Sequence, residues 1–200
     1  MLHAVQHIEL NAIDLAWDMV ARFTDHDLPR AFYDDWVRVG DEEAKHFTLL
    51  ADRIAELGFS YGDFPAHDGL WEAATATREN LAARLAVVPM VLEARGLDVT
   101  PAMITRFGKI GDKKSVNVLN VILNDEIGHV AIGSRWFHHF CKNNDLDAEK
   151  TWQELVQKFF KGLLKPPFND AAREVAGLPE KYYQPLSSPL PQKQTKNSKF

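Results

Sequence analysis

The chain has 200 residues, of which 46% are hydrophobic and 26% are charged, the balance of an ordinary soluble globular protein. A formal net charge of −5 provides no broad basic surface, which disfavours nucleic-acid binding but does not exclude a local basic patch. The single cysteine excludes an internal disulfide and a cysteine-based zinc site, and it indicates a reducing, cytoplasmic setting.

The N-terminal residues "MLHAVQHIELNAIDLAWD" predict a helix that begins at once. They have no basic leading region and carry acidic residues within the apolar stretch, which is unlike a signal peptide. No run along the chain approaches 18 consecutive apolar residues, so we expect no membrane-spanning helix.

Apolar residues recur with helical periodicity almost throughout, which predicts an all-α fold. Four long helices are expected, over residues 2–23, 29–57, 77–110 and 112–142. Gly58 is suited to end the second helix. The third helix should bend at Pro89, break at Gly96 and resume at Thr100-Pro101.

Residues 59–76, between the second and third helices, are rich in Gly, Pro and Asp and predict a long crossover with a short helical turn in "LWEAATAT". A four-helix bundle needs such a crossover where two consecutive helices run parallel. We therefore expect one domain, with the bundle over residues 1–143, a helical extension over 144–177 and a polar, mobile tail over 178–200.

Two of the predicted helices carry a glutamate and a histidine three residues apart on their apolar stripes. In "GDEEAKHFTLL" these are Glu43 and His46, and in "LNDEIGHVAIG" they are Glu126 and His129. A residue and its i+3 neighbour share one helical face, so each pair can bind one metal ion. One such pair is a weak signal, but two pairs on buried stripes are not expected by chance. Burying four ionisable groups without compensation would be costly, and a divalent metal supplies the compensation.

A two-metal site in a helical bundle also needs one carboxylate from each of the other two helices. Glu9 replaces an apolar residue in the stripe of the first helix, and Glu93 lies in "VVPMVLEARG" on the third. Each candidate glutamate lies roughly 20–26 Å from the turn at one end of its helix, at 1.5 Å per residue, so all can meet at mid-bundle. The six candidate metal ligands are Glu9, Glu43, His46, Glu93, Glu126 and His129.

The ligand order E, E-x-x-H, E, E-x-x-H resembles that of the ferritin-like di-iron carboxylate superfamily. More closely, "HIELNAIDLAWD", "DEEAKHFTLL", "LEARGLD", "NDEIGHVAIG" and "PPFNDAAREVAG", within residues 1–177, resemble a bacterial ferritin-like family catalogued only as a domain of unknown function. "EAKHF" and "LEAR" are similar, more distantly, to the tRNA isopentenyladenosine hydroxylases. Members of the bacterial family usually carry a segment before the first helix, so we expect this chain to lack an N-terminal lid or partner surface.

The resemblance implies a ferritin-like four-helix bundle whose six ligands bind two iron ions, or manganese or a mixed pair. It implies oxygen-dependent redox chemistry, with dioxygen, an electron donor and an unknown substrate as partners. Glu43 and Glu126 would bridge or chelate the two ions, although the sequence leaves open which glutamates bridge. Glu9 and Glu93 would be terminal ligands, and each histidine would bind one ion.

Each E-x-x-H glutamate directly follows another acidic residue, Glu42 in one helix and Asp125 in the other. We expect these two acids to accept hydrogen bonds from the ligand histidines across the bundle, as supporting carboxylates do at metal sites.

The preferred function is a di-iron oxidoreductase that hydroxylates or otherwise oxidises its substrate. The alternatives are an iron-handling or peroxide-detoxifying protein like the ferritins and rubrerythrins, a tRNA hydroxylase, and a non-enzymatic metal-binding protein. A rubrerythrin usually adds a cysteine-rich module, which one cysteine excludes, and the acidic balance disfavours tRNA. Residues 145–200 extend the chain beyond the length of a compact ferritin bundle. This extension would cover a site or provide the interface of a homodimer.

The other histidines are expected outside the metal site. His7 lies about 200° round the helix from Glu9 and should face outward or pack locally. His138 and His139 should lie beyond the site. For His67, in the crossover, the sequence leaves two alternatives: a surface position or contact with a substrate. Core positions are expected for Trp17, Trp36, Trp136 and Phe137. Gly128 and Gly133 are costly within a helix, and we expect them to allow close helix packing, with a small channel as the alternative.

Overall fold

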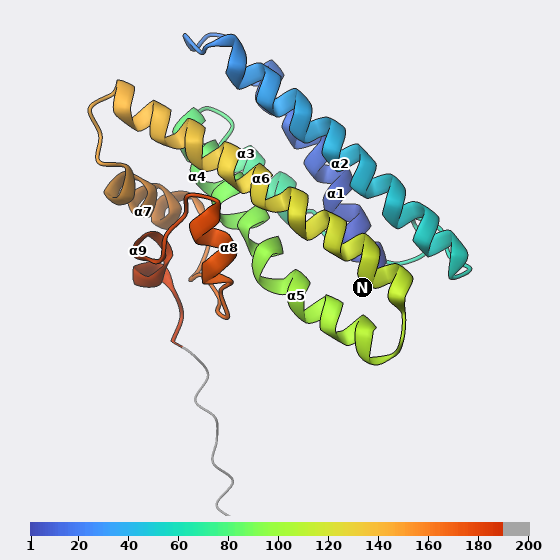
Figure 1. Cartoon of the computed structure of the whole chain (residues 1–200). Helices are drawn as coiled ribbons and strands as arrows, with labels where there is room; N and C mark the ends of the chain where they lie inside the picture. The colour runs from blue at the N-terminus through green and yellow to red at the C-terminus, as the bar shows by residue number, and fades with distance from the viewer. Residues whose placement is uncertain (190–200) are drawn as a thin grey trace, which may run out of the picture.

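The computed structural model describes residues 1–189, and every regular element within them is a helix (Figure 1). The all-α prediction is therefore confirmed for this part of the chain. Strand-like pairing over the same residues is limited to one isolated bridge between Leu164 and Ser187. None of the helices described is both long and apolar enough to cross a membrane.

The first two long helices follow their predicted bounds closely. α1 spans Leu2–Arg22 and α2 spans Arg30–Glu56. Gly58 follows α2 with a φ of +83°, a left-handed conformation that glycine adopts without the steric cost of a Cβ. The crossover then passes through the short helix α3, Gly69–Ala76, which packs against α1.

The third long helix is continuous but changes from α-helical to π-helical and back to α-helical along its length. It comprises α4 (Leu81–Val87), the π-helical turn η1 (Val88–Glu93) and α5 (Ala94–Lys109). It starts later than predicted because Asn80 accepts a hydrogen bond from the backbone N–H of Ala83 at 2.8 Å and thereby caps the first turn. The bend expected at Pro89 takes the form of the π-helical turn, which carries Glu93 at its end.

The predicted break at Gly96 and the new start at Pro101 are wrong, because α5 runs through both residues. Proline has no N–H to donate to the carbonyl four residues earlier, which here belongs to Leu97. The side-chain amide of Asn169 donates to that carbonyl instead, at 3.1 Å. A residue of the C-terminal extension thus supplies the hydrogen bond that the helix loses at Pro101.

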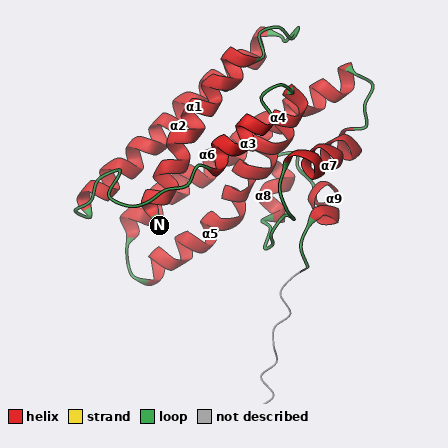
Figure 2. Cartoon of the chain, turned by 180° about the vertical axis from the view of Figure 1, so that it is seen from behind, coloured by secondary structure: helices red, strands yellow, loops and turns green. Residues whose placement is uncertain are grey.

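The last long helix, α6, spans Lys113–Asn143 and packs against both α2 and α5. Because α1 packs on α2, the four long segments follow one another around the molecule as α1, α2, α6 and α5 (Figures 1 and 2). In the described part of the chain α1 and α5 have little direct packing, and α3 lies against α1 and η1 beside them. The side between α1 and α5 is therefore the least closed.

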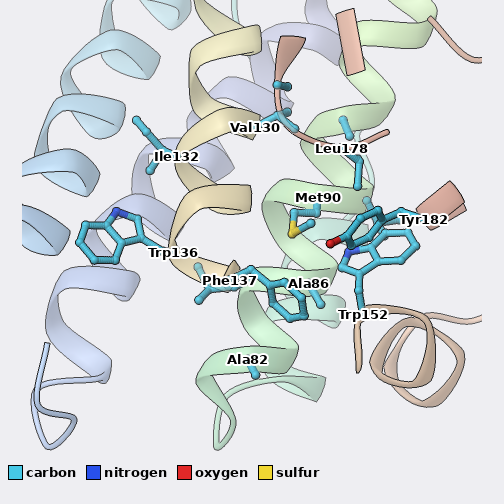
Figure 3. Packing of buried hydrophobic residues seen from close by; sticks show 14 of the residues in the cluster. Ala82, Ala86, Met90, Val130, Ile132, Trp136, Phe137, Trp152, Leu178 and Tyr182 are labelled. Carbon is cyan, nitrogen blue, oxygen red and sulfur yellow. The ribbon is translucent and has the colours of Figure 1, made fainter. Parts of the chain in front are cut away.

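The C-terminal extension packs on the end of the molecule where α4 and α6 meet. It contains α7 (Ala148–Phe159), α8 (Asp170–Val175), α9 (Glu180–Tyr183) and the 3₁₀ turn η2 (Gln184–Leu186). Figure 3 shows Met90 of η1 and Phe137 of α6 beside Trp152 and Tyr182 of the extension, all within one buried apolar cluster.

The prediction that the tail begins at residue 178 is wrong for residues 178–186. Leu178, Tyr183 and Leu186 are buried in the same apolar cluster, so these residues belong to the folded extension. Apolar burial of this kind is what holds such a segment on the core. Residues 190–200 of the predicted tail lie outside the described residues.

Three further predictions concern tight packing and the core. A Cβ added at Gly133 would come within 2.4 Å of the Pro89 Cβ, so Gly133 allows α6 to approach η1 as predicted. The same prediction is wrong for Gly128, which is exposed and where a Cβ would meet nothing within 4 Å. Trp17 is 50% exposed, since it lies about 100° round α1 from the buried stripe that contains Ala16. The predicted core positions are confirmed for Trp36, Trp136 and Phe137.

Candidate metal centre

Five of the six predicted ligands lie close together between the long helical segments, and the sixth, Glu93, lines the same cavity as the other three glutamates. Glu9 comes from α1, and Glu93 ends the π-helical turn η1. The E-x-x-H pairs come from α2 and α6, because residues three apart on a helix share a face. Five of the six are buried residues: Glu9, Glu43, His46, Glu126 and His129. Glu93 is partly exposed as a residue, but its Oε2 atom is buried.

Four of these side chains are close enough to share one cation. One ligand atom from each of Glu9, Glu43, His46 and Glu126 lies within 4.8 Å of the others. The His46 Nδ1 is 3.2 Å from Glu9 Oε2, 3.3 Å from Glu43 Oε2 and 3.9 Å from Glu126 Oε1.

The second histidine faces the same carboxylates from the other side. His129 Nδ1 is 3.0 Å from Glu43 Oε1 and 3.6 Å from Glu126 Oε1. The two imidazole rings have their centroids 5.7 Å apart, with Glu43 contacting both. Glu43 and Glu126 therefore lie between the histidines, whereas Glu9 lies close to His46.

Three buried polar atoms of this cluster make no well-aligned hydrogen bond among the described residues: Glu93 Oε2, and Glu43 Oε1 and His129 Nδ1, which face each other at 3.0 Å. A buried polar atom without a partner costs about 1–3 kcal/mol, and more if it is charged. All three are atom types that ligate transition metals. The donor set and its unsatisfied atoms thus fit a bound metal.

Hydrogen bonds on the far side of each ring hold the two histidines in place. His129 Nε2 donates to Glu42 Oε2 at 2.8 Å, and His46 Nε2 donates to Asp125 Oδ2 at 3.1 Å. Both bonds cross between α2 and α6, as the sequence predicted. An Nε2–H held by a carboxylate fixes the tautomer in which Nδ1 carries the lone pair, which is the atom facing the other candidate ligands.

The sequence did not predict the role of Lys45, which supports the metal centre through Asp125. Lys45 donates to Asp125 Oδ2 at 2.6 Å and helps hold the carboxylate that binds His46. No spacing pattern marks Lys45, because its partner lies 80 residues away on another helix. Burial alone would raise the pKa of Asp125, but hydrogen bonds from Lys45 and His46 lower it overall, so Asp125 stays ionised.

The pKa values of the clustered side chains are shifted because four carboxylates are buried close to one another. Burial raises the pKa of Glu93 to about 8, with Glu126 and Glu43 adding to the effect. Burial and the nearby Glu43 also raise the pKa of Glu9. Burial alone would lower the pKa of His46, but hydrogen bonds to Glu43 and Glu9 outweigh it and raise this pKa to about 10. Without a metal, protons therefore supply the compensating positive charge.

This proton uptake predicts how the stability of the metal-free protein depends on pH. Glu93 and His46 hold protons in the folded chain at pH values where the unfolded chain, with ordinary pKa values of 4.5 and 6.5, has released them. Stability should therefore fall as pH rises from 6.5 to 8.5, by up to about 1.4 kcal/mol per pH unit for each such proton. Thermal melts in a chelator measure this, and Glu93→Gln should reduce the slope. A melting temperature that is constant or rises over this range would contradict the prediction.

Asp125→Ala is expected to lower metal affinity about 10–100-fold, because His46 would lose the hydrogen bond that orients it. The neighbouring exposed residue offers a matched control, Asn124→Ala, which should leave the affinity unchanged. Titration with Co²⁺, followed by its visible absorption, compares the two variants. Equal affinity of Asp125→Ala and the unaltered chain would remove this supporting role.

The remaining histidines lie outside the cluster, as expected. His7 packs locally, with Nδ1 2.8 Å from the hydroxyl of Tyr61 in the crossover. His138 contacts Tyr182 of α9 at 2.8 Å through Nε2. His67 is exposed, as one of the two alternatives predicted, and it also lines a cavity that reaches the cluster. Contact of His67 with a substrate stays a prediction.

Fold and site together define an all-helical protein with a buried glutamate–histidine cluster able to hold a metal ion. The chain belongs to the family described as "Protein of unknown function (DUF455)", whose match covers residues 1–184 and confirms the predicted membership of a family of unknown function. It is 46% identical over 181 residues to an uncharacterized protein of Haemophilus influenzae, an alignment that covers 88% of this chain and 63% of that relative. The chain thus spans less than two thirds of the relative's length. No solved structure matches the chain.

Proposed function

We propose that this protein is a ferritin-like di-metal carboxylate oxidoreductase that uses two iron ions and dioxygen to oxidise an organic substrate. The observation that carries the proposal is the buried cluster in which Glu9, Glu43, His46 and Glu126 are close enough to share one cation. His129 Nδ1 lies 3.0 Å from Glu43 Oε1, and Glu93 lines the same cavity as the other three glutamates. Mixed carboxylate and imidazole ligands suit iron, and manganese or a mixed pair would suit the same donors. The single buried cysteine accords with a reducing cytoplasm.

The contacts support a distinct role for each ligand. Glu43 and Glu126 lie near both histidines and would bridge or chelate the two ions. Glu9 would be terminal at the His46 ion. Glu93, which lines the same cavity as the other three glutamates, would be the second terminal ligand.

When bound, two iron ions would supply the redox chemistry with dioxygen that no side chain provides. The protein's own residues prepare the site for them. Glu42 and Asp125 hold the Nε2–H tautomers, so that each Nδ1 is directed inward. His46 must release its Nδ1 proton for metal to bind, and metal affinity should therefore rise with pH.

The arrangement of the long helices supports the ferritin-like bundle that we propose for the fold. Such bundles join two helical hairpins by one long crossover. Here α1 and α2 form one pair, the segment from α4 to α5 and α6 form the other, and residues 57–80 connect them. Each pair contributes one E-x-x-H motif and one further glutamate.

An apolar cavity beside the carboxylates favours oxidation of an organic molecule over storage of iron. Hydroxylation inserts one oxygen atom of dioxygen into the substrate and reduces the other to water, which consumes two electrons and two protons. The protein would therefore need an electron donor as a partner. An iron-handling protein would instead need a polar route for hydrated ions to the same carboxylates.

Anaerobic titration with Fe²⁺ followed by exposure to oxygen tests the proposal. We expect two tightly bound ions per chain, oxygen uptake by the loaded protein and no growth of an iron mineral when Fe²⁺ is in excess. Continued oxidation of excess Fe²⁺ would favour iron handling. Bound metal without oxygen uptake would favour a non-enzymatic metal-binding protein, and no bound metal would refute both readings.

A further inference from the structure

A cavity of about 280 Å³ opens on the side of the molecule between α1 and α5. All four glutamates of the metal centre line it, whereas neither histidine does. The histidines are closed off by Glu42 and Asp125 on the opposite side, between α2 and α6. A molecule can therefore reach the carboxylates through this cavity, and the positions it would meet are those that the histidines leave open.

Between the glutamates at its inner end and His67 and Arg95, the walls of the cavity are apolar apart from Thr100. They are formed from α1, the crossover, α5 and α6, with Val5, Ala12, Leu70, Val99, Met103 and Ile122 among them. No described residue of the C-terminal extension lines the cavity, so the predicted covering of the site by the extension is not seen there. Apolar walls with a few polar groups at one end are typical of small-molecule sites.

The exposed lining residues Ile8 and His67 mark the opening of the cavity, which the partly exposed Arg95 also lines. Arg95 lies 3.4 Å from Asp98, but Asp98 is already paired with Arg173 at 2.7 Å. Arg95 Nη1 also donates to the carbonyl of Lys165 at 2.6 Å, but a carbonyl adds no negative charge. One carboxylate thus faces two guanidinium groups, so the positive charge of Arg95 is not fully neutralised. Electrostatics at this end favour an anion, while the apolar walls favour a hydrocarbon body.

We propose that this cavity binds the substrate of the metal centre, and that the substrate is a small amphipathic anion such as an aliphatic or aromatic carboxylate. Its apolar body extends along the walls toward the four glutamates, and its anionic group lies near Arg95 at the opening. The proposal rests on the oxidoreductase function for its chemistry, but binding of the anion does not require the metal.

Octanoate is the probe for a direct test on the metal-free 200-residue chain. The chain has four methionines, and Met103 lines the cavity while Met19 and Met90 lie in the main apolar core. With ¹³C-labelled methionine methyl groups, octanoate should shift the Met103 resonance in a saturable manner and leave those of Met19 and Met90 in place. Absence of a saturable Met103 shift would overturn the proposal, as would larger shifts at Met19 or Met90.

Gly96 offers a second test because it lines the cavity and a Cβ there would meet nothing within 4 Å. Gly96→Phe should fill the cavity without strain and weaken octanoate binding at least about tenfold. Gly108 provides the matched control, since it lies in the same helix, is exposed and also has open space around it. Gly108→Phe should bind octanoate like the unaltered chain, and equal binding by the two variants would refute the assignment.

Two comparisons separate the parts of the inference. Octanoate should bind about fivefold more tightly than 1-octanol if the positive opening recognises an anion, and equal affinities would overturn that part. Co²⁺ binding, read from its visible spectrum, reports the metal centre alone. Loss of Co²⁺ binding with octanoate binding intact would refute the oxidoreductase function but not the cavity site, and the reverse result would refute only the cavity site.

Discussion

Replacing Glu43 by glutamine is expected to lower the affinity of the centre for both metal ions by more than about 100-fold, beyond the loss expected from a supporting residue. Glu43 is the carboxylate that contacts both histidines, at 3.3 Å from His46 Nδ1 and 3.0 Å from His129 Nδ1. An amide of the same shape keeps the packing but removes the negative charge that two cations would share. Isothermal or optical titration with Co²⁺ measures the loss.

The matched control for this variant is Asp41→Asn, which changes an exposed carboxylate of the same helix two residues away. It should bind Co²⁺ like the unaltered chain. Helical circular dichroism should show that both variants remain folded. Retention of tight binding by Glu43→Gln would mean that the cluster is a buried polar network rather than a two-metal centre.

Much of this site could be predicted from sequence because the spacing of residues within each helix determines which side chains share a face. The i+3 spacing within α2 and α6 puts each glutamate on the same face as its histidine, whatever the rest of the fold does. The depth of each ligand along its helix follows from the rise per residue. The bonds of Glu42 and Asp125 were also predictable, since each precedes a ligand on a helix that faces the other pair.

The features that escaped prediction depend on partners far away in the sequence. Pro101 remains inside α5 because Asn169, 68 residues later, satisfies the carbonyl of Leu97. The apolar cavity arises from the separation of α1 and α5, and neither helix carries a pattern that reveals this spacing. Residues 178–186 looked like a polar tail, yet four apolar side chains there are buried against α4, α6 and α7: Leu178, Tyr182, Tyr183 and Leu186.

Asp98→Ala is expected to lower the free energy of unfolding by about 3–5 kcal/mol, because it leaves the buried guanidinium of Arg173 without its partner. The Asp98 side chain is fully buried and that of Arg173 is 3% exposed, with 2.7 Å between Asp98 Oδ2 and Arg173 Nη2. Arg173 also donates to the Ala94 carbonyl at 3.3 Å, directly after Glu93. The pair therefore fixes the C-terminal extension to the turn that carries a metal ligand.

Urea unfolding of the metal-free chain measures the loss, and the double variant Asp98→Ala/Arg173→Leu should recover part of it by removing the unpaired charge. Lys150→Ala, which breaks an exposed ion pair with Glu154, should stay within about 0.5 kcal/mol of the unaltered chain. If Asp98→Ala is as stable as Lys150→Ala, the pair does not hold the extension. If the loss is confirmed, weaker metal binding by Asp98→Ala would show that the extension stabilises the position of Glu93, although it lines neither the cavity nor the metal centre.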